Sequence, residues 1–340
     1  MSDFPFVTVI IPTLNSGKVL DKCLRSIKQQ LYPKKKIEII IADGGSTDNT
    51  LDIVNHYAAI IFKNPLKTGE AGKAVALKKA KGELVALIDS DNVLPTNNWL
   101  TRMVEPFKDE QIIGSEPWEY TYRKNNGFID RYCAMIGMND PLCLFIGNYD
   151  RKCLLTNKWT KLKIESEDKK NWIKIKIDSD QIPTIGANGT IFRKDIIIKS
   201  GLVKDYLFDI DIIASLANMK PVYFAKVKIG IIHLYCGNDI KKFYRKQKRR
   251  INDFYYFRKN NLRTYPWQKQ ISLFLYLKFV LSCLMILPLF IQTIVGFLKK
   301  PDFAWFFHPL ACWLTLWIYS SQSLIAKTRR IKIERINWKQ

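Results

Sequence analysis

The feature that most constrains this chain is an alternation of short apolar runs with helical patterns over its first 230 residues. β-Branched runs occupy Val7–Pro12, Ile37–Ala42 and Leu84–Ile88. Helical patterns occupy Lys18–Gln30 and Thr50–Tyr57, which lie between those runs. Strands that alternate with helices are typical of a parallel sheet joined by crossover helices. The sequence therefore predicts an α/β fold in which helices flank a mostly parallel sheet.

Two long apolar stretches follow near the C-terminus. Ile271–Phe297 contains one charged residue, Lys278, and Phe303–Ala326 is rich in aromatic residues. A helix of about 20 apolar residues crosses a bilayer core of about 30 Å, and aromatic side chains favour the lipid–water interface. These stretches predict a C-terminal transmembrane helical hairpin within residues 269–326. Two buried helices of a soluble domain, or a shallow re-entrant hairpin, are the alternatives.

The chain is strongly basic, with 54 Lys and Arg residues against 31 Asp and Glu residues and a net charge of +23. Such an excess indicates an anionic partner, which is nucleic acid, an acidic membrane or a phosphorylated substrate. The basic residues are densest at Lys241–Arg263 and Lys327–Lys332, on either side of the apolar stretches. This placement favours a membrane with anionic lipids and argues against nucleic acid.

These patterns divide the chain into four segments. Residues 1–235 are the α/β domain, with a polar insertion at about 150–181. Residues 236–268 are a basic, amphipathic membrane-surface segment, 269–326 hold two transmembrane helices, and 327–340 are a basic cytoplasmic tail. Because basic flanks stay inside, we expect a multi-pass protein of the cell membrane whose N-terminal domain lies on the cytoplasmic side. Seven scattered cysteines without a C-x-x-C pair favour a reducing compartment.

Acidic residues follow two of the expected strands. Asp43 begins a glycine-containing turn, and Asp89 and Asp91 follow Leu84–Ile88. Ligands bind at the carboxyl ends of strands in sheets of this kind. Two carboxylates one residue apart supply oxygen ligands for a divalent cation such as Mg²⁺ or Mn²⁺, which bridges phosphate oxygens. A plain turn and a chance Asp-x-Asp pair are the alternatives.

Three segments carry a specific combination of motifs. They are Val-Thr-Val-Ile-Ile-Pro-Thr-Leu-Asn at 7–15, Ala-Asp-Gly-Gly-Ser-Thr-Asp-Asn-Thr at 42–50, and Lys-Gly-Glu-Leu-Val-Ala-Leu-Ile-Asp-Ser-Asp at 81–91. Together they resemble family 2 glycosyltransferases, which have the GT-A fold. The resemblance implies an inverting, metal-dependent sugar transfer from a nucleotide-diphosphate donor to a membrane-associated acceptor in glycan synthesis. A lipid-linked saccharide and a polyprenyl phosphate are the two acceptor classes.

The resemblance also implies a set of nucleotide-sugar contacts. Asp43 would bind the base, and Pro12 and Asn15 would line the nucleotide. Lys73 would place a positive charge near the diphosphate, although a solvated helix face is the plain alternative for it. The full set is Pro12, Thr13, Asn15, Asp43, Gly45, Lys73, Asp89, Ser90, Gly186 and Asn188.

The metal is assigned by the same resemblance. Asp91 would hold Mg²⁺ or Mn²⁺ on the diphosphate, with Asp89 in support. His233 follows an apolar run near the position of a family histidine that some members use at the metal or diphosphate. A structural role at the end of that run is the alternative for His233.

The segment Tyr-Leu-Phe-Asp-Ile-Asp-Ile-Ile-Ala-Ser-Leu at 206–216 resembles the start of the family's catalytic helix, with Phe208 in place of a glutamate. An inverting transfer to a hydroxyl group needs a general base. The resemblance gives that role to Asp209, with Asp211 as a second carboxylate. An acceptor that is already a phosphate anion needs no strong base, and helix capping is the alternative for both residues.

Gln-Lys-Arg-Arg-Ile at 247–251 resembles the Gln-x-x-Arg-Trp motif of membrane-embedded processive members, with Ile251 in place of tryptophan. It would associate Gln247 and Arg250 with the membrane and the diphosphate. A basic amphipathic surface helix explains this stretch equally well. A single apolar hairpin favours single transfer over polymer synthesis.

Two other functional classes remain open. A sugar-phosphate nucleotidyltransferase binds nucleotides on a related sheet, but it requires a glycine-rich signature with Arg and Lys near the N-terminus, where this chain has Pro12–Asn15. A non-enzymatic, basic membrane-binding protein is the other alternative.

Overall fold

The computed structural model describes residues 4–186, 188–265 and 272–328. Within these ranges the chain forms two compact units. The first, here called the sheet unit, comprises residues 4–118 and 163–233, and the second, the helical unit, comprises residues 119–162 and 234–328. Residues 119–162, which the sequence places in the 1–235 domain, therefore group with the C-terminal helices.

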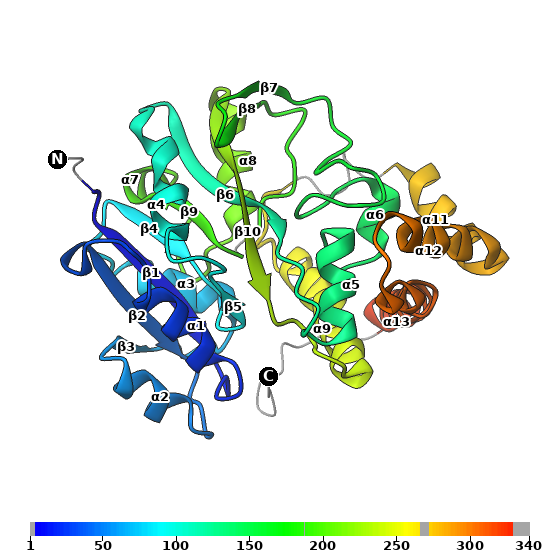
Figure 1. Ribbon diagram of the computed structural model, residues 1–340, viewed down its shortest axis with the longest axis horizontal. Helices are drawn as coiled ribbons and strands as arrows, with labels where there is room; N and C mark the ends of the chain where they lie inside the picture. The colour runs from blue at the N-terminus through cyan, green and yellow to red at the C-terminus, as the bar shows by residue number, and fades with distance from the viewer. Residues whose placement is uncertain (1–3, 187, 266–271, 329–340) are drawn as a thin grey trace. The chain divides into compact units, whose positions relative to one another are not determined.

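The sheet unit is built on one ten-stranded sheet within the described residues. The strand order is β3-β2-β1-β4-β9-β6-β10-β8-β7, and β5 pairs with β10 (Figure 1). The strands are β1 (Val7–Thr13), β2 (Ile37–Asp43), β3 (Ile60–Lys63), β4 (Leu84–Leu87), β5 (Asn92–Val93), β6 (Ile112–Tyr120), β7 (Glu165–Asp168), β8 (Trp172–Ile177), β9 (Thr190–Arg193) and β10 (Val222–His233). The helices of this unit are α1 (Leu20–Lys28), α2 (Thr50–His56), α3 (Gly69–Leu77), α4 (Trp99–Val104), α7 (Lys194–Lys199) and α8 (Asp209–Met219).

Strands β1 to β4 form a parallel half of the sheet. Val7 of β1 lies opposite Ile37 of β2 on one side and Leu84 of β4 on the other. All seven side chains of β1 are buried, as expected for a parallel strand covered on both faces. The three strands expected from the sequence are confirmed, and their carboxyl ends meet at one edge of the sheet.

The other half of the sheet is antiparallel. Strand β9 pairs antiparallel with β4 and β6, and β8 pairs antiparallel with β7 and β10. The expectation of a mostly parallel sheet is wrong here, because antiparallel neighbours are joined by hairpins and loops and need no crossover helix. The resulting mixed sheet with flanking helices fits the GT-A fold that the resemblance implies.

The polar insertion expected at 150–181 contains part of this antiparallel half. Strands β7 and β8 form a hairpin within it. The segment Trp172–Ile177 alternates apolar residues with lysine, and its Ile175 and Ile177 are fully buried. Such alternation is the signal of a half-buried strand, so the sequence did contain the evidence for this hairpin.

The helical unit has a core of aromatic, aliphatic and cysteine side chains that includes Tyr132, Phe243 and Trp305. Helix α13 packs along α9 in this unit. The ion pair between Arg131 and Asp302, at 2.9 Å, joins α5 to the turn that precedes α13. The helices are α5 (Phe128–Ile136), α6 (Leu142–Ile146), α9 (Ile240–Lys259), α11 (Leu273–Met285), α12 (Leu287–Lys299) and α13 (His308–Thr328).

The two apolar stretches do not form the expected pair of straight spans. The first stretch forms α11 and α12, which are bent by 92° relative to each other. Within the described ranges no single helix is both long and apolar enough to cross a membrane, and α11 and α12 reach that length when taken together. The transmembrane hairpin expected at 269–326 is therefore not supported by the helices themselves.

Some expected segments extend outside the described residues. They are 266–268 of the surface segment 236–268, 269–271 of the expected hairpin, and 329–340 of the basic tail 327–340.

Candidate functional site

Asp43 is the centre of the loop that follows β2. Its carboxylate accepts hydrogen bonds from the Thr13 hydroxyl at 2.9 Å and from the backbone N–H groups of Gly45 and Ser46 at 2.8 Å each. The Ser46 hydroxyl donates a fourth bond at 2.6 Å. Because a carboxylate has about four acceptor positions, the loop itself uses them all. A contact between Asp43 and a nucleotide base therefore requires one of the hydroxyl donors to rotate away.

Asn15 fixes the neighbouring loop, which follows β1. Its backbone is left-handed, with φ of 52°, a conformation that asparagine adopts more readily than most residues. The Asn15 side-chain oxygen accepts a hydrogen bond from the Thr47 N–H at 2.8 Å, and the Asn15 N–H donates to Ser46 Oγ at 2.8 Å. The two loops after β1 and β2 therefore hold each other in place.

Gly45 gives this pair of loops an open backbone face. Its φ is +90°, a region that favours glycine, and no atom of a described residue lies within 4 Å of the position that a Cβ would occupy. A ligand can approach the backbone closely at this point.

The Asp89-Ser90-Asp91 segment leaves the end of β4 in a tight turn. The Asp89 N–H donates to Asn92 Oδ1 at 3.1 Å, and the Asn92 N–H donates back to the Asp89 carbonyl at 2.9 Å. Ser90 is buried, and its Oγ lies 3.0 Å from Ser16 Oγ in the loop after β1. This contact holds the turn against the loop after β1.

His233 reaches the same turn from the far half of the sheet. It is the last residue of β10 and lies opposite Asn92 of β5. Its Nε2 lies 3.3 Å from Asp91 Oδ1. The fold therefore brings the candidate histidine to the candidate metal-binding carboxylate, although the two are far apart in the sequence.

Asp89, Asp91 and His233 are the residues that could hold a metal ion. Within the described part of the chain, no group of three or more histidine, cysteine or acidic side chains is arranged to hold one unaided. The donor chemistry of hard carboxylate oxygens with one imidazole nevertheless suits Mg²⁺ or Mn²⁺, and Mg²⁺ is usually bound by one or two carboxylates together with substrate phosphates.

Lys73 connects the candidate metal-binding turn, Asp89–Asp91, to the candidate base. Its Nζ lies 4.0 Å from Asp89 Oδ1 and 3.9 Å from Asp209 Oδ1. The lysine is buried, so its solvated-face alternative is excluded. Burial acts to lower the pKa of Lys73, but the carboxylates of Asp209 and Asp89 outweigh it and raise that pKa above its ordinary value. The side chain is therefore a buried cation between two acidic groups.

Gly72 explains how Lys73 comes to this position. A Cβ on Gly72 would lie 2.8 Å from the Cβ of Pro12 at the end of β1 and 3.4 Å from the Cβ of Ala42 in β2. Glycine therefore lets α3 approach both strands closely. This close approach sets α3 against the carboxyl edge of the sheet, with the Lys73 ammonium beside Asp89.

Asp209 and Asp211 lie in the first turn of α8. Phe208 occupies the N-cap position, and no side chain makes a cap hydrogen bond there, so neither aspartate is the N-cap. Burial raises the pKa of the Asp209 carboxyl, while the Lys73 charge works in the opposite direction. Asp211 is more deeply buried than Asp209. The arrangement leaves Asp209, rather than Asp211, next to Lys73 and the metal-binding turn.

The glycine-containing segment before β9 also meets the metal-binding turn. Asn188 Oδ1 accepts a hydrogen bond from Asn92 Nδ2 at 3.0 Å, and the Gly189 N–H donates to the Leu87 carbonyl at 3.0 Å. Among the described residues, no atom lies within 4 Å of the position that a Cβ on Gly186 would occupy. Gly186 therefore has open space beside it, as Gly45 has.

Gln247 and Arg250 belong to the helical unit, where they form a polar network. The Arg250 guanidinium donates to Gln247 Oε1 at 3.0 Å and lies 3.6 Å from Asp140 Oδ2. Gln247 Nε2 donates to the Asn139 carbonyl at 2.6 Å, and the Tyr319 hydroxyl donates to Asp140 Oδ2. Within this unit the pair connects α9 to α13 and to the loop before α6.

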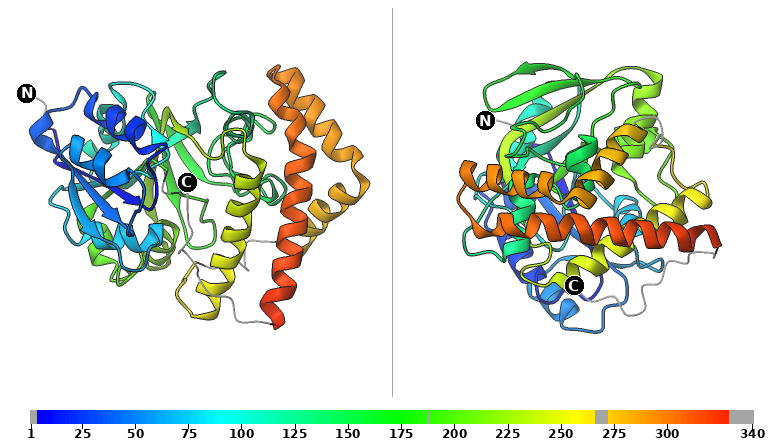
Figure 2. Two further views of the ribbon diagram at one scale, coloured as in Figure 1. Left: turned by 90° about the horizontal axis from the view of Figure 1, so that it is seen from below. Right: turned by 90° about the vertical axis from the view of Figure 1, so that its right-hand side faces the viewer.

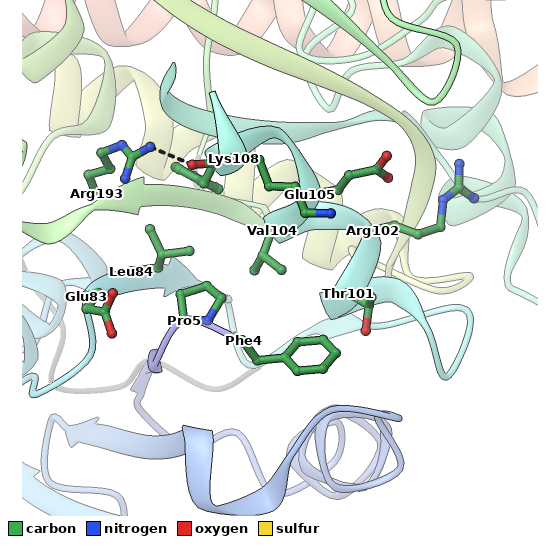
Figure 3. A pocket seen from close by; sticks show the side chains of 11 residues that line it. Phe4, Pro5, Glu83, Leu84, Thr101, Arg102, Val104, Glu105, Lys108 and Arg193 are labelled. Atoms are coloured by element: carbon green, nitrogen blue, oxygen red, sulfur yellow. Dashed lines mark hydrogen bonds between the residues drawn. The ribbon is translucent and has the colours of Figure 1, made fainter. Parts of the chain in front are cut away.

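A separate cavity of about 390 Å³ lies at the amino ends of β1 and β4, away from these residues. Phe4, Pro5, Glu83 and Leu84 line one side (Figure 3). Arg193 and Phe107 also line the cavity, and the Arg193 guanidinium donates a hydrogen bond to the Phe107 carbonyl at 2.8 Å. It contains none of the residues that the sequence marks for chemistry.

Two residues of the site were not predicted from the sequence. Asn92 joins the metal-binding turn to Asn188, and its position directly after Asp91 was the available signal. Glu70 adds negative charge near Lys73 and Asp209, and its carbonyl accepts the Leu207 N–H at 2.9 Å. This last bond holds the start of α8 against α3, which nothing in the sequence indicates.

Comparison with known proteins gives an independent view of the same region. A family model described as glycosyl transferase family 2 matches residues 8–185. The chain is 29% identical over 145 residues to glycosyltransferase AglE of Haloferax volcanii, covering 40% of this chain and 47% of that protein. It is 33% identical over 136 residues to the Escherichia coli UDP-Glc:alpha-D-GlcNAc-diphosphoundecaprenol beta-1,3-glucosyltransferase WfaP, covering 39% and 50%. The matches thus span about half the length of these relatives.

A solved structure resembles nearly the whole chain. It is the mannosyltransferase PcManGT from Pyrobaculum calidifontis in complex with GDP-Man and Mn²⁺, with a TM-score of 0.52 and 16% identity, covering 94% of this chain and 88% of that chain. At this identity the likeness shows a common fold.

Proposed function

Because the chain belongs to glycosyl transferase family 2, we propose that it transfers a sugar from a nucleotide-diphosphate donor to a membrane-associated acceptor, with inversion. The Escherichia coli relative is named for an acceptor linked to diphosphoundecaprenol. That name supports a lipid-linked saccharide as the acceptor class for this chain, with a polyprenyl phosphate as the second form. The reaction then belongs to the synthesis of a cell-surface glycan or glycoconjugate.

One observation carries the proposal: Lys73 lies within 4.0 Å of both Asp89 and Asp209. A glycosyl transfer requires a leaving diphosphate, cations to offset its charge and a base on the acceptor side. Lys73 and the carboxylates on either side of it supply a cation and a candidate base within one small space. Pairing with Asp89 and Asp209 keeps Lys73 charged despite its burial.

The nucleotide end of the donor is assigned to the loops after β1 and β2. Pro12, Thr13 and Asn15 provide one wall, and Asp43 with Gly45 provides the other. Their mutual hydrogen bonds form this surface before the donor arrives, which lowers the ordering cost of binding. Ser90, Gly186 and Asn188 continue the donor site toward the sugar.

We assign the metal to Asp91 and Asp89, with His233 beside them. Bound together with the donor, Mg²⁺ or Mn²⁺ would offset the negative charge that develops on the departing diphosphate. The contact between His233 and Asp91 orients that carboxylate. Lys73 contributes a second positive charge that comes from the chain itself.

Asp209 is assigned as the general base. A base must accept the acceptor's hydroxyl proton as that oxygen attacks the anomeric carbon. Burial raises the pKa of Asp209, which makes its carboxylate a stronger base. Asp211, two residues further along and deeper in the fold, is assigned to orienting the start of α8.

The proposal also covers how the protein is attached to a membrane and on which side of that membrane it lies. The helical unit carries the apolar helices and the basic helix α9, and it is proposed to hold the enzyme on a membrane with anionic lipids. All seven cysteines are free thiols, in keeping with a reducing compartment. From the basic flanks of the apolar stretches we propose that the catalytic unit lies on the cytoplasmic side of the cell membrane.

The test is a donor screen on the full-length protein in detergent. UDP- and GDP-sugars are offered with Mg²⁺, Mn²⁺ or a chelator, and release of nucleotide diphosphate is recorded with and without polyprenyl phosphate or diphosphoundecaprenol-linked N-acetylglucosamine. We expect metal-dependent release that an acceptor of this class accelerates. Absence of release with every donor, from protein that remains folded, would refute the proposed transfer.

Calorimetry with Asp91→Asn tests the metal assignment. This variant is expected to lose metal-dependent donor binding. Asp195→Asn is the matched control, since Asp195 pairs with Lys199 on α7 and lies in no assigned site. Equal donor affinity in wild type and Asp91→Asn, with metal present, would overturn the assignment.

A further inference from the structure

Helices α11 and α12 expose a large apolar face, in which Lys278 of α11 is also exposed. On α11 the exposed residues follow helical spacing from Leu273 to Met285, and on α12 from Leu287 to Leu298. The side chains of Leu284, Met285 and Leu287 at the bend are 68%, 66% and 65% exposed. The full set is Leu273, Phe274, Leu277, Leu281, Leu284, Met285, Ile286, Leu287, Phe290, Ile291, Ile294, Val295 and Leu298. A patch of this size is rare on proteins that meet only water.

The buried side of the same helices is smaller and more polar than the exposed side. Each helix buries one large apolar residue, Phe279 of α11 and Leu289 of α12, and the other buried residues are small or polar: Ser282, Cys283, Thr293 and Gly296. In a water-soluble helix the large apolar residues face the core and the polar residues face solvent. Small and polar residues at helix contacts, with large apolar residues outside, are instead typical of helices surrounded by lipid.

Helix α13 repeats this inverted pattern. It buries His308, Thr315 and Gln322 and exposes Trp313 and Trp317. The Trp313 indole donates to the Cys283 carbonyl of α11 at 2.8 Å, so α13 and α11 share this surface. Tryptophan with one polar end and one apolar body favours the boundary between lipid and water.

The bend between α11 and α12 determines how deep the pair can reach. Ile286 has φ of +63°, which breaks the helix, and Pro288 lies in the first turn of α12. Each helix has 13 residues, which makes it about 20 Å long. The V points its bend away from α13 (Figure 2). With a bend of 92°, the tip of a symmetric V lies about 14 Å from the level of its ends, close to half of a bilayer core of about 30 Å.

Charges are missing from the tip of the V: Lys278 is exposed midway along α11, and Lys299 and Lys300 lie at the open end. No charged residue occurs between Lys278 and Lys299. Lys299 Nζ donates to the Leu155 carbonyl at 2.6 Å, and Lys300 Nζ lies 4.0 Å from the centre of the Tyr122 ring, so both amines are fixed at that end. Further basic residues are exposed on α9, which packs against α13 in the same unit; they are Lys241, Arg245, Lys248, Arg258 and Lys259.

We propose that α11 and α12 form a wedge that inserts into one leaflet of an anionic lipid bilayer, with both of its ends on the same side. The apolar faces meet acyl chains, the basic end meets anionic headgroups, and Trp317 lies at the boundary. The wedge deepens the proposed function, since it keeps the enzyme at the membrane surface where a lipid-linked acceptor is found. The proposal rests on the helical unit alone and does not depend on the catalytic assignments.

Vesicle flotation of the full-length protein tests the wedge. Vesicles contain phosphatidylcholine and phosphatidylglycerol in equal amounts, and binding is measured at low salt and at about 1 M NaCl, where surface attraction is screened. Wild type is expected to float in both. The Leu284→Asp/Met285→Asp variant is expected to lose roughly tenfold or more of its high-salt binding, because a charge in the acyl region is costly.

Leu31→Asp is the matched control. Leu31 lies in the sheet unit and is 73% exposed, so the same chemical change there adds a charge without touching the wedge. Unfolding temperature and donor affinity in detergent are measured for each variant. Equal vesicle binding by wild type and the tip variant at high salt overturns the wedge. If wild type floats but binds no donor, the result counts against the proposed function and not against the wedge.

Labelling distinguishes a wedge from a span. In a Cys143→Ser background, which leaves six buried cysteines, single cysteines replace Ser272, Met285 or Pro301, of which Pro301 is exposed just after α12. Protein bound to sealed vesicles is then treated from outside with a membrane-impermeant maleimide. The wedge predicts labelling at 272 and 301 and protection at 285. Labelling at only one of the two ends indicates a span and overturns the proposal. The proposal is also overturned if wild type binds no vesicles and instead self-associates, and if the tip variant abolishes this self-association.

Discussion

In the sheet unit, β1 and β4 bury valine, isoleucine and leucine along their length, and the polar side chains gather where the strands end. In the helical unit, α12 and α13 bury Thr293, Thr315 and Gln322 and expose Phe290 and Trp317. The first arrangement minimises apolar contact with water. The second arrangement exposes apolar side chains and is unfavourable in water, but it suits helices whose outer neighbours are acyl chains.

The comparison separates two uses of buried polar groups. At the carboxyl edge of the sheet, Lys73 and Asp209 form a charged pair beside loops whose backbone is open to a ligand. Inside the helical unit, the His308 ring lies within hydrogen-bond distance of Tyr132 and Gln292 and joins three helices. Groups of the first kind are available for chemistry, whereas groups of the second kind hold helices together.

The largest expected effect is on turnover. Asp209→Asn removes the proposed base and keeps the side chain's size, so turnover with a hydroxyl acceptor is expected to fall by roughly 10²–10⁴-fold. Donor affinity is expected to stay unchanged. Steady-state kinetics with calorimetry for the donor measure both quantities.

Asp211→Asn is the matched control for this variant, and it is expected to cost less turnover. If the two effects are reversed, the base is Asp211 and the assignment is off by two residues. Near-normal turnover in both variants would mean that the acceptor is a phosphate anion, which needs no deprotonation.

The second effect concerns the apolar interior of the sheet unit. Glu116 of β6 and Lys226 of β10 are both fully buried and form an ion pair at 2.6 Å. Lys226→Met leaves a buried carboxylate without that partner and is expected to lower the free energy of unfolding by about 3–5 kcal/mol. Urea denaturation measures this loss. A Glu116→Gln/Lys226→Met double variant is expected to recover part of it, since the buried negative charge is gone; no recovery would contradict the ionic explanation.

The strands and the chemistry at their ends could be predicted from the sequence. β-Branched runs fix β1, β2 and β4, and parallel neighbours end at a common edge, so the positions of Asp43 and Asp89 followed directly. Lys73 could be placed on a helix but not beside Asp209, because that contact depends on how closely Gly72 lets α3 approach Pro12. His233 meets Asp91 through the pairing of β5 with β10, which joins two parts of the chain that are far apart in the sequence.

The C-terminal helices show a different limit of sequence reasoning. Apolar length predicted two membrane spans, whereas no single helix in the described ranges is both long and apolar enough to cross a membrane. The bend depends on the backbone conformation of Ile286, and isoleucine rarely adopts a positive φ. Pro288 was the available signal, since proline often marks a kink or a helix start. Which side chains of α11 and α12 face outward depends on how these two helices pack against α13.

The third effect tests the buried side of the wedge. A Cβ on Gly296 would lie 2.5 Å from the ring of Trp305, which is itself fully buried. Gly296→Ala is therefore expected to force α12 away from Trp305 and to destabilise the helical unit by about 1–3 kcal/mol. Thermal unfolding in detergent measures this. An unchanged or higher unfolding temperature would show that the contact has room to relax.

The smallest expected effect on stability comes from the exposed side of the same helix. Leu298 is 74% exposed and Leu289 is fully buried, so the change of leucine to alanine can be made twice on α12 with different surroundings. Leu289→Ala is expected to cost about 2–5 kcal/mol of unfolding free energy in detergent, and Leu298→Ala is expected to change it by no more than about 0.5 kcal/mol.

The contribution of Leu298 to membrane binding is measured as the affinity of the protein for vesicles. Its removal takes away apolar surface that the wedge places in lipid, at about 0.8 kcal/mol for each buried methylene, so affinity is expected to fall several-fold without any loss of stability. If Leu298→Ala lowers the stability in detergent as Leu289→Ala does, that face of α12 is an interior surface of the protein, and the inversion between the two units disappears.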